Sequence, residues 1–253
     1  MGKSPLVASA IHQGHHVRPE IEELLVINEN ERLREEDPFT GLFAEILENR
    51  IIVNTSRFEV DLNRPRQKAV YKTPEDAWGL NVWKKQLPEE VINYSLGLYD
   101  NFYNEVFQFL KQLENEYGRF IILDLHSYCH RRNGPDSAPQ SAEKNPQINV
   151  GTGTMNRRFW AKIVSRFIFE IKSYDFLGQN IDIRENIRFT GGYFSRWVHE
   201  TFPKTGCCLA IEIKKTFMDE WTGLIDENVF REINNALKSA IPGLKEEINK
   251  FQG

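Results

Sequence analysis

Cysteines are few in this sequence, and long apolar runs are missing. Three cysteines among 253 residues, two of them adjacent, cannot form a disulfide framework, so reduced thiols are expected. No stretch approaches the roughly 20 consecutive apolar residues that a membrane span requires. The amino terminus also lacks the apolar segment of a secretory signal. The sequence therefore predicts a cytoplasmic protein with no membrane partner.

An excess of one charge is also lacking. The 32 basic and 36 acidic residues leave a net charge of -4 and are spread along the whole chain. No electrostatic footprint for a nucleic-acid partner stands out, so none is expected. With 40% hydrophobic residues the chain can bury one sizeable core, which predicts a single domain over residues 1–253. The sequence does not indicate an oligomeric state.

Short apolar runs alternate along the chain with longer stretches of helical periodicity. The runs are rich in β-branched or large apolar side chains, as buried strands are, and cover residues 6–11, 51–54, 120–125 and 207–213. Helical spacing of apolar residues predicts helices at 89–117 and 157–174, and a closing helix or helix pair at 227–251 that is interrupted at Pro242 and Gly243. This alternation predicts an α/β domain whose sheet is covered on both faces.

Most histidines of the chain follow two of the predicted strands. His12, His15 and His16 come just after the first apolar run, and His126 and His130 after the third. Ligands of open α/β sheets bind beyond the carboxyl ends of the strands, where the two groups would meet. His12, His15 and His126 are candidate ligands of one Zn²⁺, since catalytic zinc sites take three protein ligands and leave a position for water. The alternative is that these are polar loop residues without a metal.

One charged residue stands inside an otherwise apolar strand. Glu212 lies in the run 208–213, where burial of a carboxylate is costly unless it faces a cleft or a partner. It is the candidate general base, because attack of water on an amide needs a group that accepts a proton and returns it to the leaving nitrogen. The alternative is a structural ion pair with Lys214 or Lys215.

A basic segment follows the second predicted strand. Residues 57–66 contain three arginines and an asparagine. Arginine presents a rigid fork that binds a carboxylate through two parallel hydrogen bonds, and Asn63 beside Arg64 can donate a further bond. Arg57 is the candidate for stabilising an oxyanion. The alternative is a solvated loop with internal salt bridges.

A long loop follows the third predicted strand. Residues 131–149 hold three prolines, one glycine and many polar residues, and loops of this length are usually functional or mobile. Arg131 at its start is a candidate substrate-binding residue, with Arg132 beside it. The loop itself is a candidate lid.

These segments together resemble the N-formylglutamate amidohydrolase family, a relative of the zinc carboxypeptidases. The resemblance covers nearly the whole chain. Its most specific parts are residues 61–64 and 124–128, and the other matching stretches are 10–15, 57–66, 149–152, 191–192, 211–212 and 217–220.

The resemblance implies a fold and an activity. The fold is a three-layer α/β/α sandwich with a mixed central sheet of about eight strands, of the phosphorylase/hydrolase-like and zinc carboxypeptidase-like type. The activity is Zn²⁺-dependent cleavage of the amide of an N-formyl or N-acyl amino acid such as N-formyl-L-glutamate, a small substrate that carries a carboxylate.

The resemblance also implies roles for individual residues. By analogy with the carboxypeptidases, His12 and the residue three positions later bind zinc together with His126. Glu212 is similar to their catalytic glutamate. Asn63 and Arg64 are similar to the pair that holds the substrate carboxylate.

One position departs from the carboxypeptidase pattern, because those enzymes usually have a glutamate where this chain has His15. Glu36 or Asp37 would supply the third ligand if the His15 ring points away. Three broader alternatives stay open. Another divalent transition metal would suit imidazole ligands. The same site would serve short peptides or cell-wall fragments, and the same pocket would serve a carboxylate-binding protein without catalysis.

Overall fold

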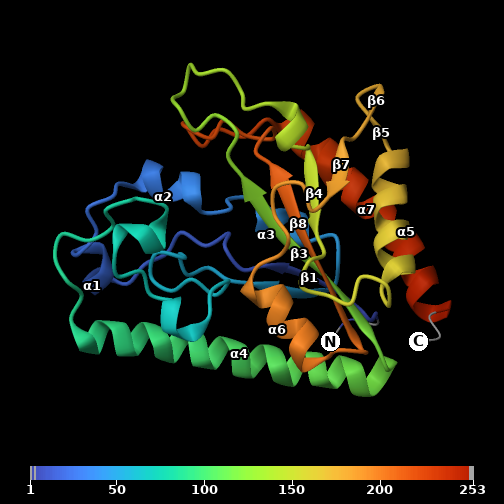
Figure 1. The fold of residues 1–253 in the computed structure, drawn as a ribbon, viewed down its shortest axis with the longest axis horizontal. Helices are drawn as coiled ribbons and strands as arrows, with labels where there is room; N and C mark the ends of the chain where they lie inside the picture. Colours follow the sequence, from blue (N-terminus) through green and yellow to red (C-terminus); the bar gives the residue numbers. More distant parts are fainter. Residues whose placement is uncertain (1, 3, 251–253) are drawn as a thin grey trace.

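A six-stranded sheet forms the centre of the protein, in a computed structural model that describes residue 2 and residues 4–250 (Figure 1). Its spatial order is β2 (Asn49–Ile52), β1 (Leu6–Ala10), β3 (Phe120–Tyr128), β8 (Gly206–Lys214), β4 (Ile148–Gly151) and β7 (Ile183–Glu185). The first four strands are parallel, whereas β4 runs antiparallel to β8 and parallel to β7. The sheet is therefore mixed, as predicted.

The predicted number of about eight strands is wrong for this sheet. Two further short strands, β5 (Asp175–Phe176) and β6 (Gln179–Asn180), are found in the described part of the chain. They pair only with each other, as an antiparallel hairpin joined by a turn at Leu177 and Gly178, both with positive φ. The hairpin lies outside the central sheet and does not extend it.

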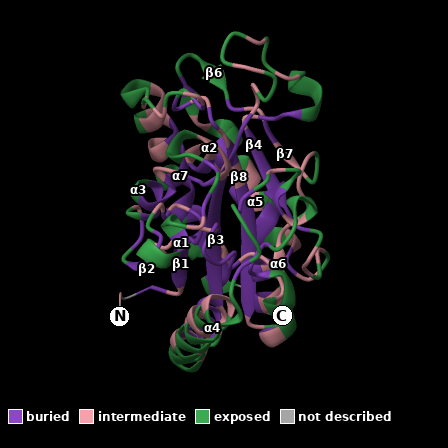
Figure 2. Ribbon diagram, turned by 90° about the vertical axis from the view of Figure 1, so that its left-hand side faces the viewer, coloured by how far each residue is buried: buried purple, intermediate pink, exposed green. Residues whose placement is uncertain are grey.

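Helices cover both faces of the sheet, which confirms the predicted three-layer arrangement. The long α4 (Glu89–Tyr117) and α6 (Tyr193–Thr201) pack on one face. The opposite face is covered by α3 (Thr40–Ala44), α5 (Ala161–Ser173) and α7 (Glu227–Lys250). Figure 2 shows the buried strands between these helical layers. No helix within the described residues is long and apolar enough to cross a membrane.

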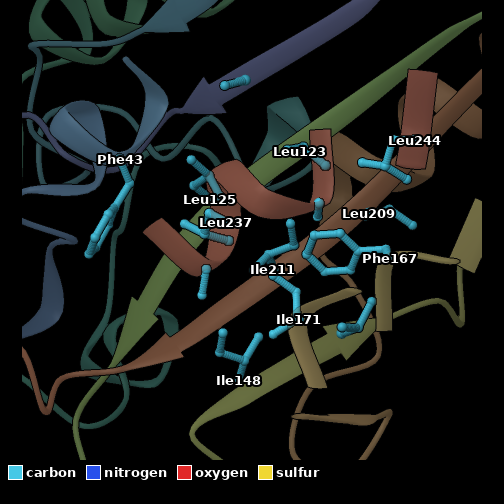
Figure 3. Packing of buried hydrophobic residues seen from close by; sticks show 14 of the residues in the cluster. Phe43, Leu123, Leu125, Ile148, Phe167, Ile171, Leu209, Ile211, Leu237 and Leu244 are labelled. Atoms are coloured by element: carbon cyan, nitrogen blue, oxygen red, sulfur yellow. The ribbon is translucent and has the colours of Figure 1, made fainter. Parts of the chain in front are cut away.

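Alternation along the central strands separates two kinds of surface. Leu123 and Leu125 of β3, with Leu209 and Ile211 of β8, point into the apolar cluster beneath α5 and α7 (Figure 3). Successive side chains of a strand point to opposite faces. The intervening residues of β3 and β8 therefore face the α4 and α6 side, where the carboxyl halves of the strands are polar.

The structure confirms some of the predicted helix boundaries and contradicts others. The helix predicted at 89–117 is confirmed with its bounds, whereas the one predicted from residue 157 begins at Ala161. The predicted interruption at Pro242 and Gly243 is wrong, because α7 runs unbroken from Glu227 to Lys250. Apolar residues on both sides of Pro242 are buried in one cluster with α5, which favours a continuous helix over a kinked pair. The predicted end at residue 251 lies outside the described residues.

The remaining elements of the amino-terminal half are short. They are α1 (Pro19–Glu22), α2 (Glu29–Glu35) and the 3-10 turns η1 (Arg66–Lys68) and η2 (Pro74–Ala77). A third 3-10 turn, η3 (Ala142–Lys144), lies in the long loop after β3, which ends where β4 begins at Ile148. The segments from α1 to the start of α4 enclose a separate apolar cluster. The segment after α2 extends to the carboxyl end of the sheet, where the polar residues gather.

Candidate active site

A cavity of about 400 Å³ opens beyond the carboxyl ends of the central parallel strands. Polar groups dominate its wall, which draws on β3, β8, the segment after α2, the segment after β2 and the loop before α6. The lining residues are His12, Arg34, Glu35, Asp37, Arg57, Asn63, Arg64, Trp78, His126, Ser127, Tyr128, Cys129, Arg132, Arg188, Phe189, Thr190, Gly191, Gly192 and Glu212.

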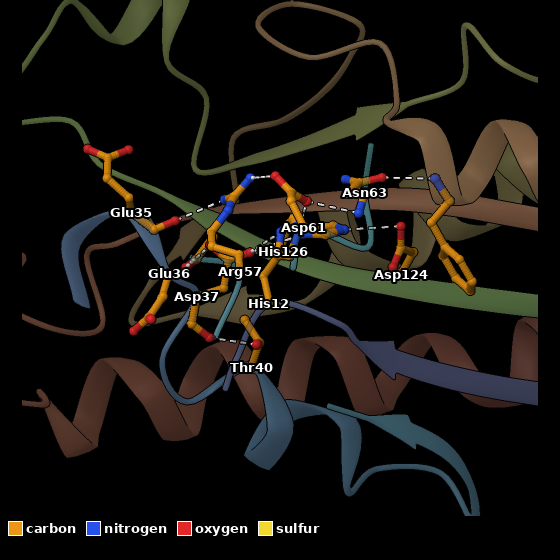
Figure 4. A network of polar contacts seen from close by, with 12 residues as sticks. His12, Glu35, Glu36, Asp37, Thr40, Arg57, Asp61, Asn63, Asp124 and His126 are labelled. Atoms are coloured by element: carbon orange, nitrogen blue, oxygen red, sulfur yellow. Dashed lines mark hydrogen bonds and ion pairs between the residues drawn. The ribbon is translucent and has the colours of Figure 1, made fainter. Parts of the chain in front are cut away.

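Two histidines and one aspartate converge in the floor of this cavity (Figure 4). His12 follows β1, His126 lies in β3 and Asp37 follows α2, and all three are buried. Asp37 Oδ2 lies 3.5 Å from His12 Nδ1 and 3.0 Å from His126 Nδ1. The ring centroids of the two histidines are 5.0 Å apart. One potential ligand atom from each of these three residues lies within 4.8 Å of the other two, which is close enough to hold one metal ion. Within the described residues, no other group of three or more histidine, cysteine, aspartate or glutamate side chains meets this distance.

The outer nitrogen of each ring is held by a buried carboxylate. His12 Nε2 lies 2.8 Å from Asp61 Oδ1, and His126 Nε2 lies 3.1 Å from Asp124 Oδ2. Ser9 Oγ in turn donates to Asp124 Oδ1 at 2.8 Å. A carboxylate on Nε2 fixes the ring orientation and keeps a proton on that nitrogen, so Nδ1 is the nitrogen that would bind a cation once it gives up its own proton. Both rings therefore offer the same nitrogen to the same point.

Charges in the floor depend on one another. Burial alone would raise the pKa of the Asp37 carboxyl, but hydrogen bonds from His12 and His126 outweigh it and hold this pKa well below its usual value. Burial alone would lower the pKa of His126, but the carboxylates of Asp124 and Asp37 outweigh it and raise this pKa well above its usual value. The floor thus keeps the Asp37 carboxylate ionised in a buried place, which suits the binding of a cation.

Glu212 lies beside this group on the neighbouring strand. It is the register partner of His126 in the parallel pairing of β3 with β8, and its half-buried side chain lines the cavity. Burial is the main cause that raises the pKa of Glu212 to about 7, with the charges of Asp37 and Asp124 adding to it and that of His126 opposing it. No salt bridge of Glu212 is found within residues 4–250.

The alternative of an ion pair with Lys215 is contradicted. Lys215 is 1% exposed, and its Nζ donates to three backbone carbonyls at the end of α2. The acceptors are the carbonyl oxygens of Arg34 and Glu36 at 2.7 Å and of Leu33 at 3.4 Å. This lysine anchors the segment that leads into Asp37.

Asp61 organises the basic segment on the other side of the floor. Arg57 Nη2 donates to Asp61 Oδ2 at 2.9 Å, and Tyr71 donates its hydroxyl to the same oxygen. Arg64 Nε lies 3.5 Å from that oxygen. The indole of Trp78, which is 46% exposed, covers the Arg57 and Arg64 guanidinium groups at 4.6 and 5.6 Å. The two guanidinium groups are therefore held side by side at the rim of the cavity.

Asn63 is fixed by the start of α6. Its Oδ1 accepts a hydrogen bond from the backbone N–H of Phe194 at 2.9 Å. This contact settles the orientation of the amide and leaves Nδ2 as a donor. Gly192 is required at the contact, since a Cβ there would lie 2.2 Å from Asn63 Oδ1. The close approach of α6 to the basic segment thus explains Gly192, whereas Gly191 is required by its positive φ of 111°.

Comparison with known proteins decides the family. The family model described as N-formylglutamate amidohydrolase matches residues 4–218. The chain belongs to this amidohydrolase family. No curated protein sequence matches the chain significantly.

Two solved structures share the fold of this amidohydrolase chain. A crystal structure of N-formylglutamate amidohydrolase from Ralstonia eutropha JMP134 superposes with a TM-score of 0.76 over 98% of this chain and 96% of its own, at 13% identity. A gene product from Agrobacterium tumefaciens superposes with a TM-score of 0.63 over 96% of this chain and 92% of its own, at 15% identity. At such identities the likeness establishes the fold alone.

The structure brings His12 and His126 together but leaves His15 outside the cluster. His15 Nδ1 lies 2.5 Å from Glu36 Oε2, and Arg32 Nη2 lies 3.1 Å from His15 Nε2. Both ring nitrogens are thus engaged by residues of the α2 segment, and the structure does not bring His15 to the other two predicted ligands. Asp37, one of the two alternatives, takes its place in the cluster. Glu36, the other, also accepts a hydrogen bond from Ser56 and lies outside the cluster.

Arg131 is also misplaced by the prediction, since it lies outside the lining of the cavity. Its backbone N–H donates to Glu220 and its carbonyl accepts from the Trp221 indole, so the chain turns away directly after β3. Arg131 lines a second cavity instead. Arg132 is the residue that lines the amidohydrolase cavity, with Glu35 as its partner at 3.2 Å.

Sequence reasoning missed three groups of the amidohydrolase site. Asp61 and Asp124 lie within segments that carried the family resemblance, so the sequence could have singled them out. Their contacts with the histidines could not be predicted from the sequence. Arg188 had no signal of its own. It follows β7, and the pairing of β7 with β4 and of β4 with β8 brings it to the cavity.

Proposed function

We propose that this amidohydrolase cleaves the amide of an N-formyl or N-acyl amino acid such as N-formyl-L-glutamate by metal-assisted attack of water. The observation that carries the proposal is the convergence of His12 Nδ1, His126 Nδ1 and Asp37 Oδ2 beside Glu212. The family match supports the amide bond as the target.

The residues present fit a divalent cation such as Zn²⁺. Two imidazole nitrogens and one carboxylate oxygen are a familiar donor set of catalytic zinc sites, which keep a further position open. The contacts of Asp61 and Asp124 with the outer ring nitrogens are those that orient such ligands. When bound, the cation supplies Lewis-acid polarisation of the scissile carbonyl and acidifies water.

The basic segment would position the substrate. Asn63 Nδ2 and the Arg64 guanidinium bind the carboxylate of the amino-acid part, and this places the amide over the floor of the cavity. Arg57 lies beside them with a fixed guanidinium group and stabilises negative charge on the carbonyl oxygen during attack.

Glu212 would move the proton. Its carboxylate accepts a proton from the attacking water and passes it to the amide nitrogen as the C–N bond breaks. The role rests on its place opposite His126 in the register and on its access to the cavity. Formate or another carboxylate and a free amino acid are then released.

The proposal is tested by metal analysis of the purified protein together with hydrolysis of N-formyl-L-glutamate and a panel of N-acyl amino acids, short peptides and cell-wall fragments. We expect about one equivalent of zinc and loss of activity with a chelator that is restored by added metal. Full activity of the metal-free protein would overturn the metal-assisted mechanism, and inactivity of the metal-loaded protein on the whole panel would overturn the proposed function.

A further inference from the structure

Five arginines line the cavity, and their charges are not compensated alike. Arg57 and Arg64 lie within 2.9 and 3.5 Å of Asp61, and Arg132 lies 3.2 Å from Glu35. Arg34 and Arg188 have no carboxylate within ion-pair distance among residues 4–250. An arginine kept in a cavity without a counter-charge is suited to an anionic group of the ligand.

The Arg188 guanidinium is held in place by neutral partners only. Its Nη1 donates to Gln140 Oε1 at 2.9 Å and to Asn145 Oδ1, both in the loop after β3. Its Cζ lies 5.1 Å from the ring centroid of Tyr128 and 5.4 Å from that of Phe189. The group is therefore oriented before any ligand enters, which reduces the entropy that binding costs.

The opposite edge of the same guanidinium is available. Within the described residues, Arg188 Nε and Nη2 make no hydrogen bond, and neither is a buried atom without a partner. Nε and Nη2 form the edge that grips a carboxylate with two parallel hydrogen bonds. This chain uses that edge elsewhere, in Arg157 with Glu185 at 2.7 and 3.1 Å and in Arg66 with Asp100 at 2.6 and 2.8 Å.

Arg34 differs from Arg188 at this edge. Arg34 Nε is buried without a partner, and the face of its guanidinium lies 3.6 Å from the Trp221 ring centroid. Its Nε–Nη2 edge therefore cannot receive a carboxylate from the cavity without rearrangement. Of Arg34 and Arg188, only Arg188 can bind a second anionic group of the ligand without a rearrangement of its side chain.

The backbone places Arg188 relative to both the base and the carboxylate-binding pair. The N–H groups of Ile187 and Arg188 donate to Asn149 Oδ1 at 3.0 and 2.9 Å, and Asn149 is the register partner of Glu212. Towards the carboxyl terminus, Gly192 follows Arg188 by four residues and lies against Asn63. Four residues span at most about 14 Å when extended, so the backbone of Arg188 lies within that distance of Gly192. One amino acid with a carboxylate at each end fits between two such groups.

We propose that Arg188 determines specificity by binding the side-chain carboxylate of the substrate through its Nε–Nη2 edge, while Asn63 and Arg64 hold the α-carboxylate. The inference rests on the proposed function and deepens it. An acidic N-acyl amino acid is then preferred over its neutral isostere, because the neutral amide cannot neutralise the Arg188 charge.

The experiment compares kcat/KM of the metal-loaded enzyme for N-formyl-L-glutamate and for the isosteric N-formyl-L-glutamine. We expect the wild-type enzyme to favour the glutamate compound roughly ten- to a hundredfold, as for hydrogen bonds between charged groups. Arg188→Met should bring the ratio towards one, mainly through KM of the glutamate compound, and Arg188→Lys should restore part of it.

Matched variants sharpen the result. Arg132→Met removes an arginine of the same cavity that already has Glu35 as its partner, so the ratio should stay at the wild-type value. An unchanged ratio in Arg188→Met, or a ratio lost in Arg34→Met but kept in Arg188→Met, would overturn the assignment. If the metal-loaded wild-type enzyme hydrolyses neither these two compounds nor the rest of the substrate panel, the proposed function fails. The assignment is then decided by calorimetric affinities of the same two compounds for the same variants.

Discussion

The two faces of strands β3 and β8 differ although they share one backbone. Towards α5 and α7, the side chains are apolar from Ile121 to Leu125 on β3 and from Cys207 to Ile213 on β8. Towards α4 and α6, apolar residues give way to Asp124, His126 and Glu212 as the strands approach their carboxyl ends. One face therefore anchors the strands, so that the other can hold buried charges in fixed positions.

The largest effect is expected at Glu212. Glu212→Gln should lower kcat by about 10²- to 10⁴-fold, the usual range for loss of a general acid–base, while the variant keeps its metal. Its free energy of unfolding should not fall, because burial disfavours the charged form of this carboxyl, with the charges of Asp37 and Asp124 adding to the effect, and the neutral amide avoids that cost. Steady-state kinetics, metal analysis and urea unfolding measure the three quantities. A clear fall in the free energy of unfolding of Glu212→Gln would show that the polar face also stabilises the fold.

The opposite result is expected on the apolar face. Leu123→Ala should lower the free energy of unfolding by about 2–5 kcal/mol, since the side chain is 0% exposed and leaves a cavity. Activity per folded molecule should change little, because Leu123 points away from the cavity. Urea unfolding and kinetics below the transition check both parts. A loss of kcat as large as that of Glu212→Gln would contradict the division.

The third prediction concerns the polar face where α6 covers it. His199 Nε2 accepts a hydrogen bond from the backbone N–H of Cys208 at 3.0 Å, and Thr154 Oγ1 lies 3.0 Å from its Nδ1. Burial lowers the pKa of His199 from 6.5 to about 4. The unfolded chain therefore takes up this proton first, so the stability contribution is complete above about pH 6.5 and is lost as the pH falls towards 4.

The shift corresponds to a loss of about 3 kcal/mol over that pH window, as an order of magnitude. Urea unfolding between pH 4 and 7 should show a smaller decline for His199→Gln than for the wild-type protein. His16→Gln is the control, since His16 is exposed. An equal decline in all three proteins would place the acid sensitivity elsewhere.

The smallest effect is expected beyond the strand, at Lys215. Lys215→Met should lower the free energy of unfolding by about 1–3 kcal/mol, because buried carbonyls at the end of α2 lose their donor. It should also weaken metal retention, since the released segment leads directly into Asp37. Metal titration and urea unfolding are compared with Lys214→Met, whose lysine is half-buried. Equal metal affinity in both variants would separate Lys215 from the site.

The sequence predicted the parts of the fold that depend on local pattern. The helix at 89–117 has a long, regular apolar period, and its bounds were recovered. The strands β4 and β7 are four and three residues long, too short for a pattern to emerge. The continuity of α7 through Pro242 depends on packing against α5, which no local pattern contains.

The candidate site divides in the same way. The meeting of His12 and His126 could be predicted, because their place after two strands is visible in the sequence. The position of His15 outside the cluster could not be predicted, because it depends on contacts of its ring with Arg32 and Glu36. The position of Arg131 outside the cavity could not be predicted, because Glu220, far along the sequence, sets the direction of the chain after β3.

The Trp78 indole gives the molecule a reporter of its own. This ring is partly open to solvent and lies over two guanidinium groups, that of Arg64, proposed to bind the α-carboxylate, and that of Arg57, proposed to stabilise the oxyanion. Neutralisation of those cations by a ligand changes the field across the ring, so its emission should follow occupancy of the rim without an added dye. The same property would let slow opening and closing of the cavity be timed in a stopped-flow instrument.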